Sequence, residues 1–181
     1  IRNHKLPHRF SAAALEQATT VATSIADEEI SRRVDLRQLP LVTIDGETAR
    51  DFDDAVALRK AADGTFRLWV CIADVSHYVV TGSALDQDAL ERGTSVYFPG
   101  FCLPMLPEAL SNGICSLNPA EDRLVMTAEL CFSPAGERLE EKFYLATMRS
   151  QARLTYTQVA ACLAAPEQAE LDSTLATQLQ Q

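Results

Sequence analysis

Two short turns that contain glycine divide much of this 181-residue chain into paired apolar runs. The turn AADGT (61–65) lies between DAVAL (54–58) and FRLWVCIADV (66–75), and the turn SPAGE (133–137) lies between LVMTAELCF (124–132) and KFYLATMRSQARL (142–154). Apolar runs joined in this way predict two antiparallel β-hairpins. Because the run at 66–75 is almost continuously apolar, it predicts a strand buried on both faces.

Helical patterns flank these strands. Residues 11–33 begin with a capping serine and carry apolar residues at helical spacing, which predicts one connecting helix. Ser83 and Gly93 frame a helix over ALDQDALER, and Thr155 or Thr157 can cap a helix over TYTQVAACLAA. The remaining segments predict short strands at 39–46 and 94–100, a long ordered loop with at most one helical turn at 101–123, and a helical tail at 166–181. Together these elements predict an α+β fold, a mixed β-sheet with packed helices.

Apolar runs, cysteine spacing and net charge exclude or disfavour several classes of protein. No run approaches the ~18 uninterrupted apolar residues of a membrane span, and the N-terminus IRNHKLPHRF lacks the apolar region of a secretory signal. We therefore expect a cytoplasmic protein without a membrane partner. The five cysteines are scattered without a C-x-x-C pair, which favours reduced, buried thiols over a zinc site. A net charge of −9 argues against a protein that simply coats nucleic acid.

The segment TIDGETARDFDDAV (43–56) concentrates negative charge between two predicted strands. Asp45, Asp51, Asp53 and Asp54 lie within ten positions, with Glu47 among them and only Arg50 to offset them. Two unit charges about 4 Å apart repel by about 4 kcal/mol at an effective dielectric of 20. Raised pKa values, basic partners or a divalent cation could compensate, and an all-oxygen ligand set suits Mg²⁺ or Mn²⁺. The alternative is that some of these residues are ordinary turn formers or solvated charges.

Spacing tests two other readings of the acidic segment. An EF-hand starting at Asp51 would need glycine and glutamate where Val56 and Ala62 stand, so it is excluded. An aspartyl phosphatase motif is disfavoured because polar residues precede Asp51 and Ala55 replaces the expected Thr or Val. Acids that hold Mg²⁺ most naturally serve phosphoryl chemistry, which indicates a nuclease or a phosphatase.

The pattern D-G-x-x-A-x-D-x-D-D, which starts at Asp45 and ends at Asp54, resembles the signature of the RNB catalytic domain in the family of ribonucleases II and R and the exosome nuclease. The resemblance continues through RRVDLRQLPLVTIDGE, RLWVCIADVSHYV, RGTSVYFPG, MLPEALSNGICSLNP and ARLTYTQV, and it is closer to the ribonuclease R branch than to the ribonuclease II branch. It implies that residues 1–10 end an OB-type cold-shock domain, that residues 11–33 form a helical connector, and that residues 34–181 form the N-terminal part of the RNB domain.

The same resemblance implies a role for each site residue. Asp45 and Asp54 would be metal ligands, and Asp51 would support the metal site and belong to the catalytic set. Asp53 would be the carboxylate most needed for cleavage, because it positions the attacking water or its proton. Tyr97 would stack against RNA near its 3′ end and set the length of the final product. From the residues alone, Tyr97 is more simply an aromatic strand residue packed in the core.

The activity implied is processive 3′-to-5′ hydrolysis of single-stranded RNA to nucleoside 5′-monophosphates, with Mg²⁺ as cofactor and Mn²⁺ as the alternative. Structured RNA is a further candidate substrate, and ribosomal or RNA-decay partners would bind through other domains. Further active-centre residues are expected beyond Gln181. Two alternatives stay open, a catalytically incomplete fragment that binds RNA or metal, and a metal-dependent phosphomonoesterase.

Overall fold

The computed structural model describes residues 6–21, 24–165, 175 and 179. Its largest element is a mixed sheet made of β1 (Val34–Asp35), β2 (Val42–Asp45), β3 (Asp54–Lys60), β4 (Phe66–Ala73), β7 (Asp122–Phe132), β8 (Arg138–Arg149) and β9 (Ala152–Thr155). The strand order is β1-β8-β7-β4-β3-β2-β9, with parallel pairing only at the two edges, β1 with β8 and β2 with β9. The predicted α+β class, a mixed sheet with helices, is confirmed.

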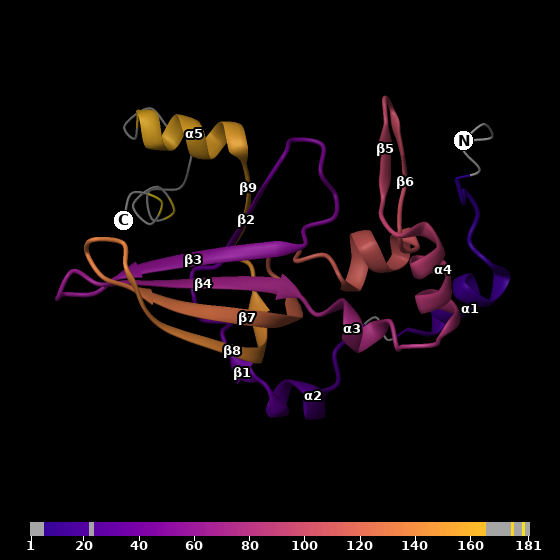
Figure 1. Cartoon of the computed structure of the whole chain (residues 1–181), viewed down its shortest axis with the longest axis horizontal. Helices are drawn as coiled ribbons and strands as arrows, with labels where there is room; N and C mark the ends of the chain where they lie inside the picture. The colour runs from indigo at the N-terminus through magenta and orange to yellow at the C-terminus, as the bar shows by residue number, and fades with distance from the viewer. Residues whose placement is uncertain (1–5, 22–23, 166–174, 176–178, 180–181) are drawn as a thin grey trace.

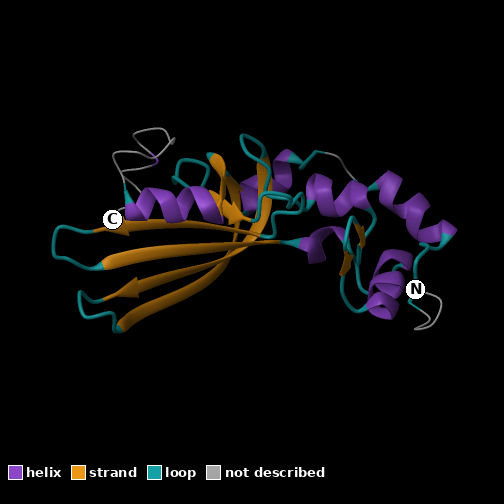
Figure 2. Cartoon of the chain, turned by 90° about the horizontal axis from the view of Figure 1, so that it is seen from above, coloured by secondary structure: helices purple, strands orange, loops and turns teal. Residues whose placement is uncertain are grey.

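Helices and a small hairpin accompany the sheet. They are α1 (Ala12–Thr20), α2 (Asp27–Arg32), α3 (Val75–Tyr78), α4 (Ala84–Arg92), the π-helical turn η2 (Ala109–Ile114), α5 (Tyr156–Ala164), and the hairpin of β5 (Val96–Phe98) and β6 (Phe101–Leu103). Figures 1 and 2 show the long strands extending toward one end of the molecule, with α1, α4 and the β5–β6 hairpin at the other. Among the described residues, no helix combines the length and apolar character needed to cross a membrane.

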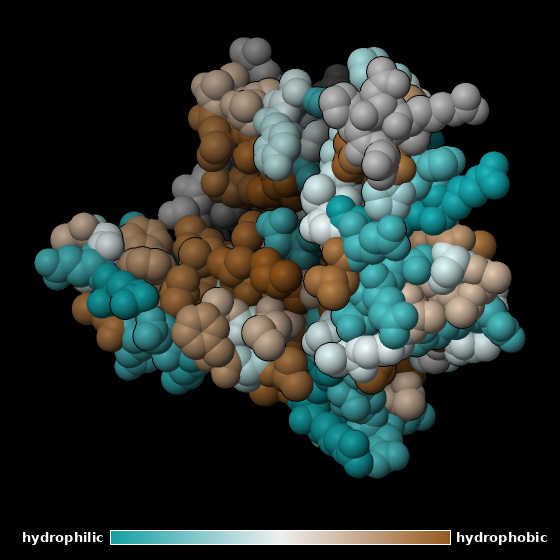
Figure 3. Space-filling view, turned by 45° about the vertical axis from the view of Figure 1, so that its right-hand side comes forward, coloured by the Kyte–Doolittle hydropathy of each residue, from teal (hydrophilic) through white to brown (hydrophobic). Residues whose placement is uncertain are grey.

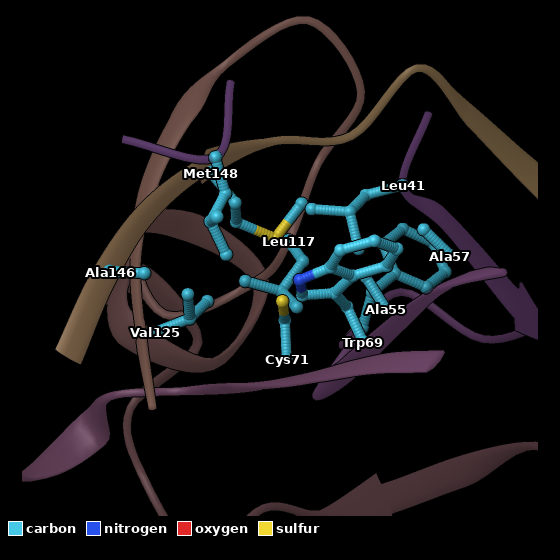
Figure 4. Packing of buried hydrophobic residues seen from close by; sticks show 11 residues of the cluster. Leu41, Ala55, Ala57, Trp69, Cys71, Leu117, Val125, Ala146 and Met148 are labelled. Atoms are coloured by element: carbon cyan, nitrogen blue, oxygen red, sulfur yellow. The ribbon is translucent and has the colours of Figure 1, made fainter. Parts of the chain in front are cut away.

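Both predicted hairpins form, and antiparallel pairing of β4 with β7 joins them. One face of this four-stranded unit packs on the main core. Figure 4 shows that core around Trp69, with Leu41, Ala55, Ala57, Cys71, Leu117, Val125, Ala146 and Met148. Burial of both faces of β4 was a wrong prediction: Trp69 and Cys71 point into the core, whereas Ile72 is 47% exposed. Ile72 lies in register with Met126 and Leu145, which are also exposed, so the opposite face keeps apolar side chains at the surface.

A second core lies where α1, α4 and η2 meet, around Ala14, Leu85 and Leu110. Ser11 caps α1 as predicted, and the side chain of Ser83 caps α4, which ends at Gly93 in the left-handed conformation. Figure 3 shows apolar side chains exposed on part of the surface beside a more polar part. All five cysteines are free, and Cys71, Cys115 and Cys162 are buried, as predicted for thiols that pack as small hydrophobic residues. For Cys102, which is exposed on the β5–β6 hairpin, and for the half-buried Cys131 that prediction was wrong.

Three local predictions were wrong. Residues 11–33 form two helices, because α1 ends at Thr20 and three acidic residues at Asp27–Glu29 favour the first turn of a new helix. The segment 101–123 contains the expected helical turn as η2, but its first residues form the strand β6, which was not predicted. The run 142–154 is two strands: β8 ends at Arg149, and β9 leaves it to pair with β2. The predicted helical tail falls almost entirely outside the described residues.

Candidate active site

The acidic residues lie on the connection between β2 and β3, close to the β2–β9 edge of the sheet. Asp45 ends β2 and Asp54 begins β3, while Asp51 and Asp53 lie in the loop between them. This loop, residues 46–53, is here called the acidic loop, and Figure 1 shows it rising from the sheet toward the side where the β5–β6 hairpin projects. The strands thus hold its two ends in the same layer.

The four aspartates share one electrostatic neighbourhood. Partial desolvation and the negative charges of Asp51, Asp45 and Asp54 raise the pKa of Asp53. Desolvation and the charges of Asp54 and Asp51 likewise raise the pKa of Asp45, which Arg153 partly offsets. The structure therefore brings together the acids that the sequence singled out, and it leaves their mutual repulsion largely uncompensated.

The donor chemistry of the acidic loop fits a hard divalent cation, because every candidate ligand is a carboxylate oxygen and the local charge is unbalanced. Within the described part of the chain, no three acidic, histidine or cysteine side chains converge closely enough to hold a metal ion. The metal role of Asp45, Asp51 and Asp54 therefore stays a prediction. The four carboxylates are neighbours that do not form a closed coordination shell.

The outer side of the acidic loop is anchored on β9 and α5. Arg153 donates hydrogen bonds to the carbonyl oxygens of Glu47 (2.7 Å) and Gly46 (3.4 Å), and its guanidinium lies 5.1 Å from the ring centre of Phe52. The Thr157 hydroxyl donates to a Glu47 carboxylate oxygen at 2.6 Å, which lowers the pKa of Glu47. The hydrogen bonds of Arg153 thus hold the loop backbone.

Tyr97 lies beside the acids. It is on β5, 68% exposed, and its hydroxyl donates a 3.2 Å hydrogen bond to Asp51 Oδ2. Partial desolvation and the Asp51 charge raise the pKa of Tyr97. Core packing, the simpler reading of this residue, is wrong, because most of the ring faces solvent. An exposed aromatic ring next to clustered carboxylates is a surface on which a nucleobase could stack.

Three further polar residues, Asp74, His77 and Arg149, have their polar partners outside the acidic loop. Asp74 is buried and forms a 2.7 Å ion pair with Arg33, and His77 Nδ1 lies 3.9 Å from Glu29. Arg149 pairs with Asp122 at 2.7 Å. Ser116 and Arg123 contact the loop or its supports without any sequence signal except polarity next to a predicted strand. Thr157 stood out only as a possible helix cap, and its contact with Glu47 was not predicted.

Comparison with known proteins identifies relatives across nearly the whole chain. The family model described as the RNB domain matches residues 33–181. Ribonuclease R of Vibrio parahaemolyticus is 54% identical over 168 residues, which is 93% of this chain and 20% of that protein. The chain thus spans about a fifth of the length of this curated relative.

Solved structures agree with the sequence relatives. Mycoplasma genitalium RNase R in complex with double-stranded RNA superposes with a TM-score of 0.91 at 36% identity, covering 98% of this chain and 32% of that one. The same enzyme in complex with ribose-methylated single-stranded RNA gives a TM-score of 0.90 at 36% identity, covering 98% and 28%. Both matches cover nearly the whole of this chain.

Proposed function

We propose a function from one premise: this chain belongs to the RNB domain family. Because the chain spans about a fifth of its curated relative, the activity proposed is that of a whole protein to which the chain contributes the acidic loop and the β5–β6 hairpin. That protein hydrolyses single-stranded RNA processively from the 3′ end, uses Mg²⁺ or Mn²⁺, and releases nucleoside 5′-monophosphates. The relatives solved with RNA support RNA as its substrate class.

The observation that carries this proposal is the contact between Tyr97 and Asp51. A ring that stacks a base contributes about 1–3 kcal/mol whatever the sequence of the RNA. Since this ring is joined to the acidic loop by a hydrogen bond, a nucleotide stacked on it lies next to Asp51 and its neighbours. Sequence-independent stacking beside an acidic centre suits an enzyme that degrades a strand step by step.

Each aspartate has a separate role in this proposal. Asp45 and Asp54 hold the cation with support from Asp51, and when bound the cation supplies Lewis acidity to the scissile phosphate. Asp53 orients the attacking water and accepts its proton as the new P–O bond forms. The bond between phosphorus and the 3′ oxygen of the preceding nucleotide breaks, so the departing nucleotide keeps its 5′ phosphate. The released 3′ oxygen takes up a proton from water, which leaves the shortened strand with a new 3′ hydroxyl.

The test is degradation of 5′-labelled poly(A) by the full-length protein with Mg²⁺. Asp53→Asn should slow cleavage by about 10²–10⁴-fold, the range typical of a lost proton acceptor, while RNA binding persists. Glu140→Gln is the matched control, since Glu140 is an exposed carboxylate on β8, outside the acidic loop. Unchanged laddering to short oligonucleotides in Asp53→Asn would contradict the assignment of Asp53.

A second candidate is that this chain alone binds RNA or metal without turnover. The incomplete convergence of the described carboxylates and the small share of each relative that the chain covers favour it. Assays of the 181-residue chain beside a longer form of the protein separate the candidates. Turnover only in the longer form means that residues outside this chain complete the centre.

A further inference from the structure

Phe52 lies between Asp51 and Asp53, and its backbone N–H and its backbone carbonyl both form hydrogen bonds to the segment after η2. Its N–H donates to Ser116 Oγ at 3.0 Å, and its carbonyl accepts from the Leu117 N–H at 2.8 Å. The Phe52 ring is 5% exposed and belongs to the main core. The backbone of the acidic loop is therefore held in place at Phe52, the residue between Asp51 and Asp53.

The Ser116 hydroxyl reaches the backbone on both sides of Asp51. Besides accepting from Phe52, it lies 3.3 Å from the Arg50 carbonyl oxygen and 3.4 Å from Asn118 Oδ1, and its single proton can be donated to one of these at a time. Ser116 is fully buried, so water cannot readily replace the hydroxyl. An unpaired buried N–H costs about 1–3 kcal/mol, and the loop can avoid that cost by turning the Phe52 peptide outward.

Arg123 holds the main chain of Ser116 in place. Its Nε donates to the Ser116 carbonyl at 2.7 Å, and Nη2 lies 3.3 Å from the Gly113 carbonyl and pairs with Glu121. The side chain is buried, and the planar guanidinium presents these donors in a fixed geometry. The segment from Gly113 to Ser116 is thus a rigid support and not a free loop.

We propose that Ser116 is a positioning residue for Asp51 and Asp53, and that Arg123 keeps Ser116 in place; this rests on the proposed nuclease function. The orientation of the backbone at Phe52 determines the directions in which the side chains of Asp51 and Asp53 point. A displacement of about 1 Å in a catalytic group can cost 10²-fold in rate. Loss of the Ser116 hydroxyl therefore reduces turnover, while RNA binding through the Tyr97 hairpin is retained.

The experiment compares Ser116→Ala with Ser150→Ala in the full-length protein. Ser150 is the matched control, because it is 1% exposed and its hydroxyl donates to the Ala152 carbonyl at 3.1 Å and not to the backbone of the acidic loop. Both variants lose one buried hydroxyl and should lose similar stability. Only Ser116→Ala should lower kcat, by about 10–100-fold with KM for oligo(A) within about twofold.

Two readouts do not depend on turnover. Amide hydrogen exchange at Phe52 should accelerate at least tenfold in Ser116→Ala, and Mn²⁺ affinity measured by titration calorimetry should fall by a similar factor. Should Ser116→Ala fail to fold, Ser116→Cys keeps a side chain of similar size and a weak acceptor for the Phe52 N–H, and its kcat should lie between those of the parent and of an Asp53→Asn variant.

The inference is overturned if kcat, Phe52 exchange and Mn²⁺ affinity of Ser116→Ala all match those of Ser150→Ala. Failure of the proposed function has a different signature, since the parent and Ser150→Ala would then both leave RNA intact. In that case the exchange and Mn²⁺ measurements still decide whether Ser116 positions the loop.

Discussion

The Tyr97 hydroxyl donates a hydrogen bond of 3.2 Å to Asp51, although the two residues are 46 positions apart in the chain. The contact joins the tip region of a two-stranded hairpin to the loop that holds the acids. Because the ring stays largely exposed, the hydroxyl fixes the hairpin while the ring remains free to bind. Binding and chemistry can therefore be altered separately at this one side chain.

Substitution of Tyr97 should separate stacking from the contact with Asp51. Tyr97→Ala removes the ring and should weaken binding of single-stranded RNA by about 1–3 kcal/mol, with longer end products. Tyr97→Phe keeps the ring and should bind RNA nearly as tightly as the parent. Fluorescence anisotropy with labelled oligo(A) measures affinity, and gel analysis measures product length. Equal affinity of the alanine and phenylalanine variants would refute stacking on Tyr97.

Asp53→Asn should stabilise the metal-free chain at neutral pH. The pKa of Asp53 is raised in the folded state, so folding favours its protonated form; the associated stability is present at low pH and is lost as the pH rises through the raised value. Asparagine at position 53 carries no charge, so this stability is not lost as the pH rises. Because Asp53 is exposed and solvent screens its charge, the gain should be at most about 1 kcal/mol, or about 2–4 °C in Tm.

Thermal unfolding in EDTA between pH 4 and pH 8 checks this effect. The Tm difference between Asp53→Asn and the parent should be positive at pH 7 and shrink toward pH 4. Glu140→Gln should show no such trend. A variant that is less stable than the parent at pH 7 would contradict the repulsion among the aspartates.

Mg²⁺ should raise the Tm of the parent. Binding at ten times the dissociation constant stabilises by about 1.4 kcal/mol, since only the folded state assembles the site. Asp45→Asn and Asp54→Asn should each lose most of this gain, and Glu140→Gln should keep it. Differential scanning fluorimetry with and without Mg²⁺ measures the effect; equal gains in all four proteins would exclude the acidic loop as the binding site.

The buried pair of Arg33 and Asp74 should be costly to break. Their side chains are 3% and 6% exposed, and Arg33 also pairs with Glu29 at 2.7 Å. Asp74→Ala leaves the buried guanidinium with one carboxylate partner in place of two and should destabilise by about 3 kcal/mol in urea unfolding. A double variant, Arg33→Met with Asp74→Leu, should recover most of that loss.

The pH dependence of this pair has the opposite sign to that of Asp53. Burial acts to raise the pKa of Asp74, but hydrogen bonds from Ser76 and Arg33 outweigh it and lower the pKa. The stabilisation is therefore present at neutral pH and lost as the pH falls through the lowered value. If Asp74→Ala lowered the free energy of unfolding by the same amount at every pH down to pH 2, the ion pair would not be the source of the stability.

Features with local causes could be predicted from the sequence. The turns AADGT and SPAGE specify the hairpins, and Thr155 with Gln158 forms a capping box that starts α5. Non-local pairing could not be predicted: no glycine or proline marks the break at Ser150 and Gln151, and β9 leaves β8 because β2, some 110 residues earlier, offers it a parallel partner. The prediction that both faces of β4 are buried was wrong, because apolar content does not reveal whether a second layer covers a face of the strand.

The same distinction applies to the site. The aspartates stand out as a cluster of charge, whereas Tyr97 stands out only through the family resemblance. The structure places them together, and their roles stay predictions. The residues that support the acidic loop do not stand out in a motif, because Ser116 is 64 residues from Phe52 and Thr157 is 110 residues from Glu47. A serine in a loop has no distinguishing pattern until the fold brings its hydroxyl to a particular backbone group.

The parallel pairing of β2 with β9 also has a consequence for biosynthesis. The ribosome makes Asp45 about 110 residues before Thr155, its partner in the register, which at 5–20 residues per second corresponds to roughly 6–22 s. During that interval the nascent chain carries its aspartates without Arg153 and Thr157 to hold the loop. The centre is thus synthesised early and assembled late, and a chain interrupted before β9 would contain the full acidic motif without its supporting frame.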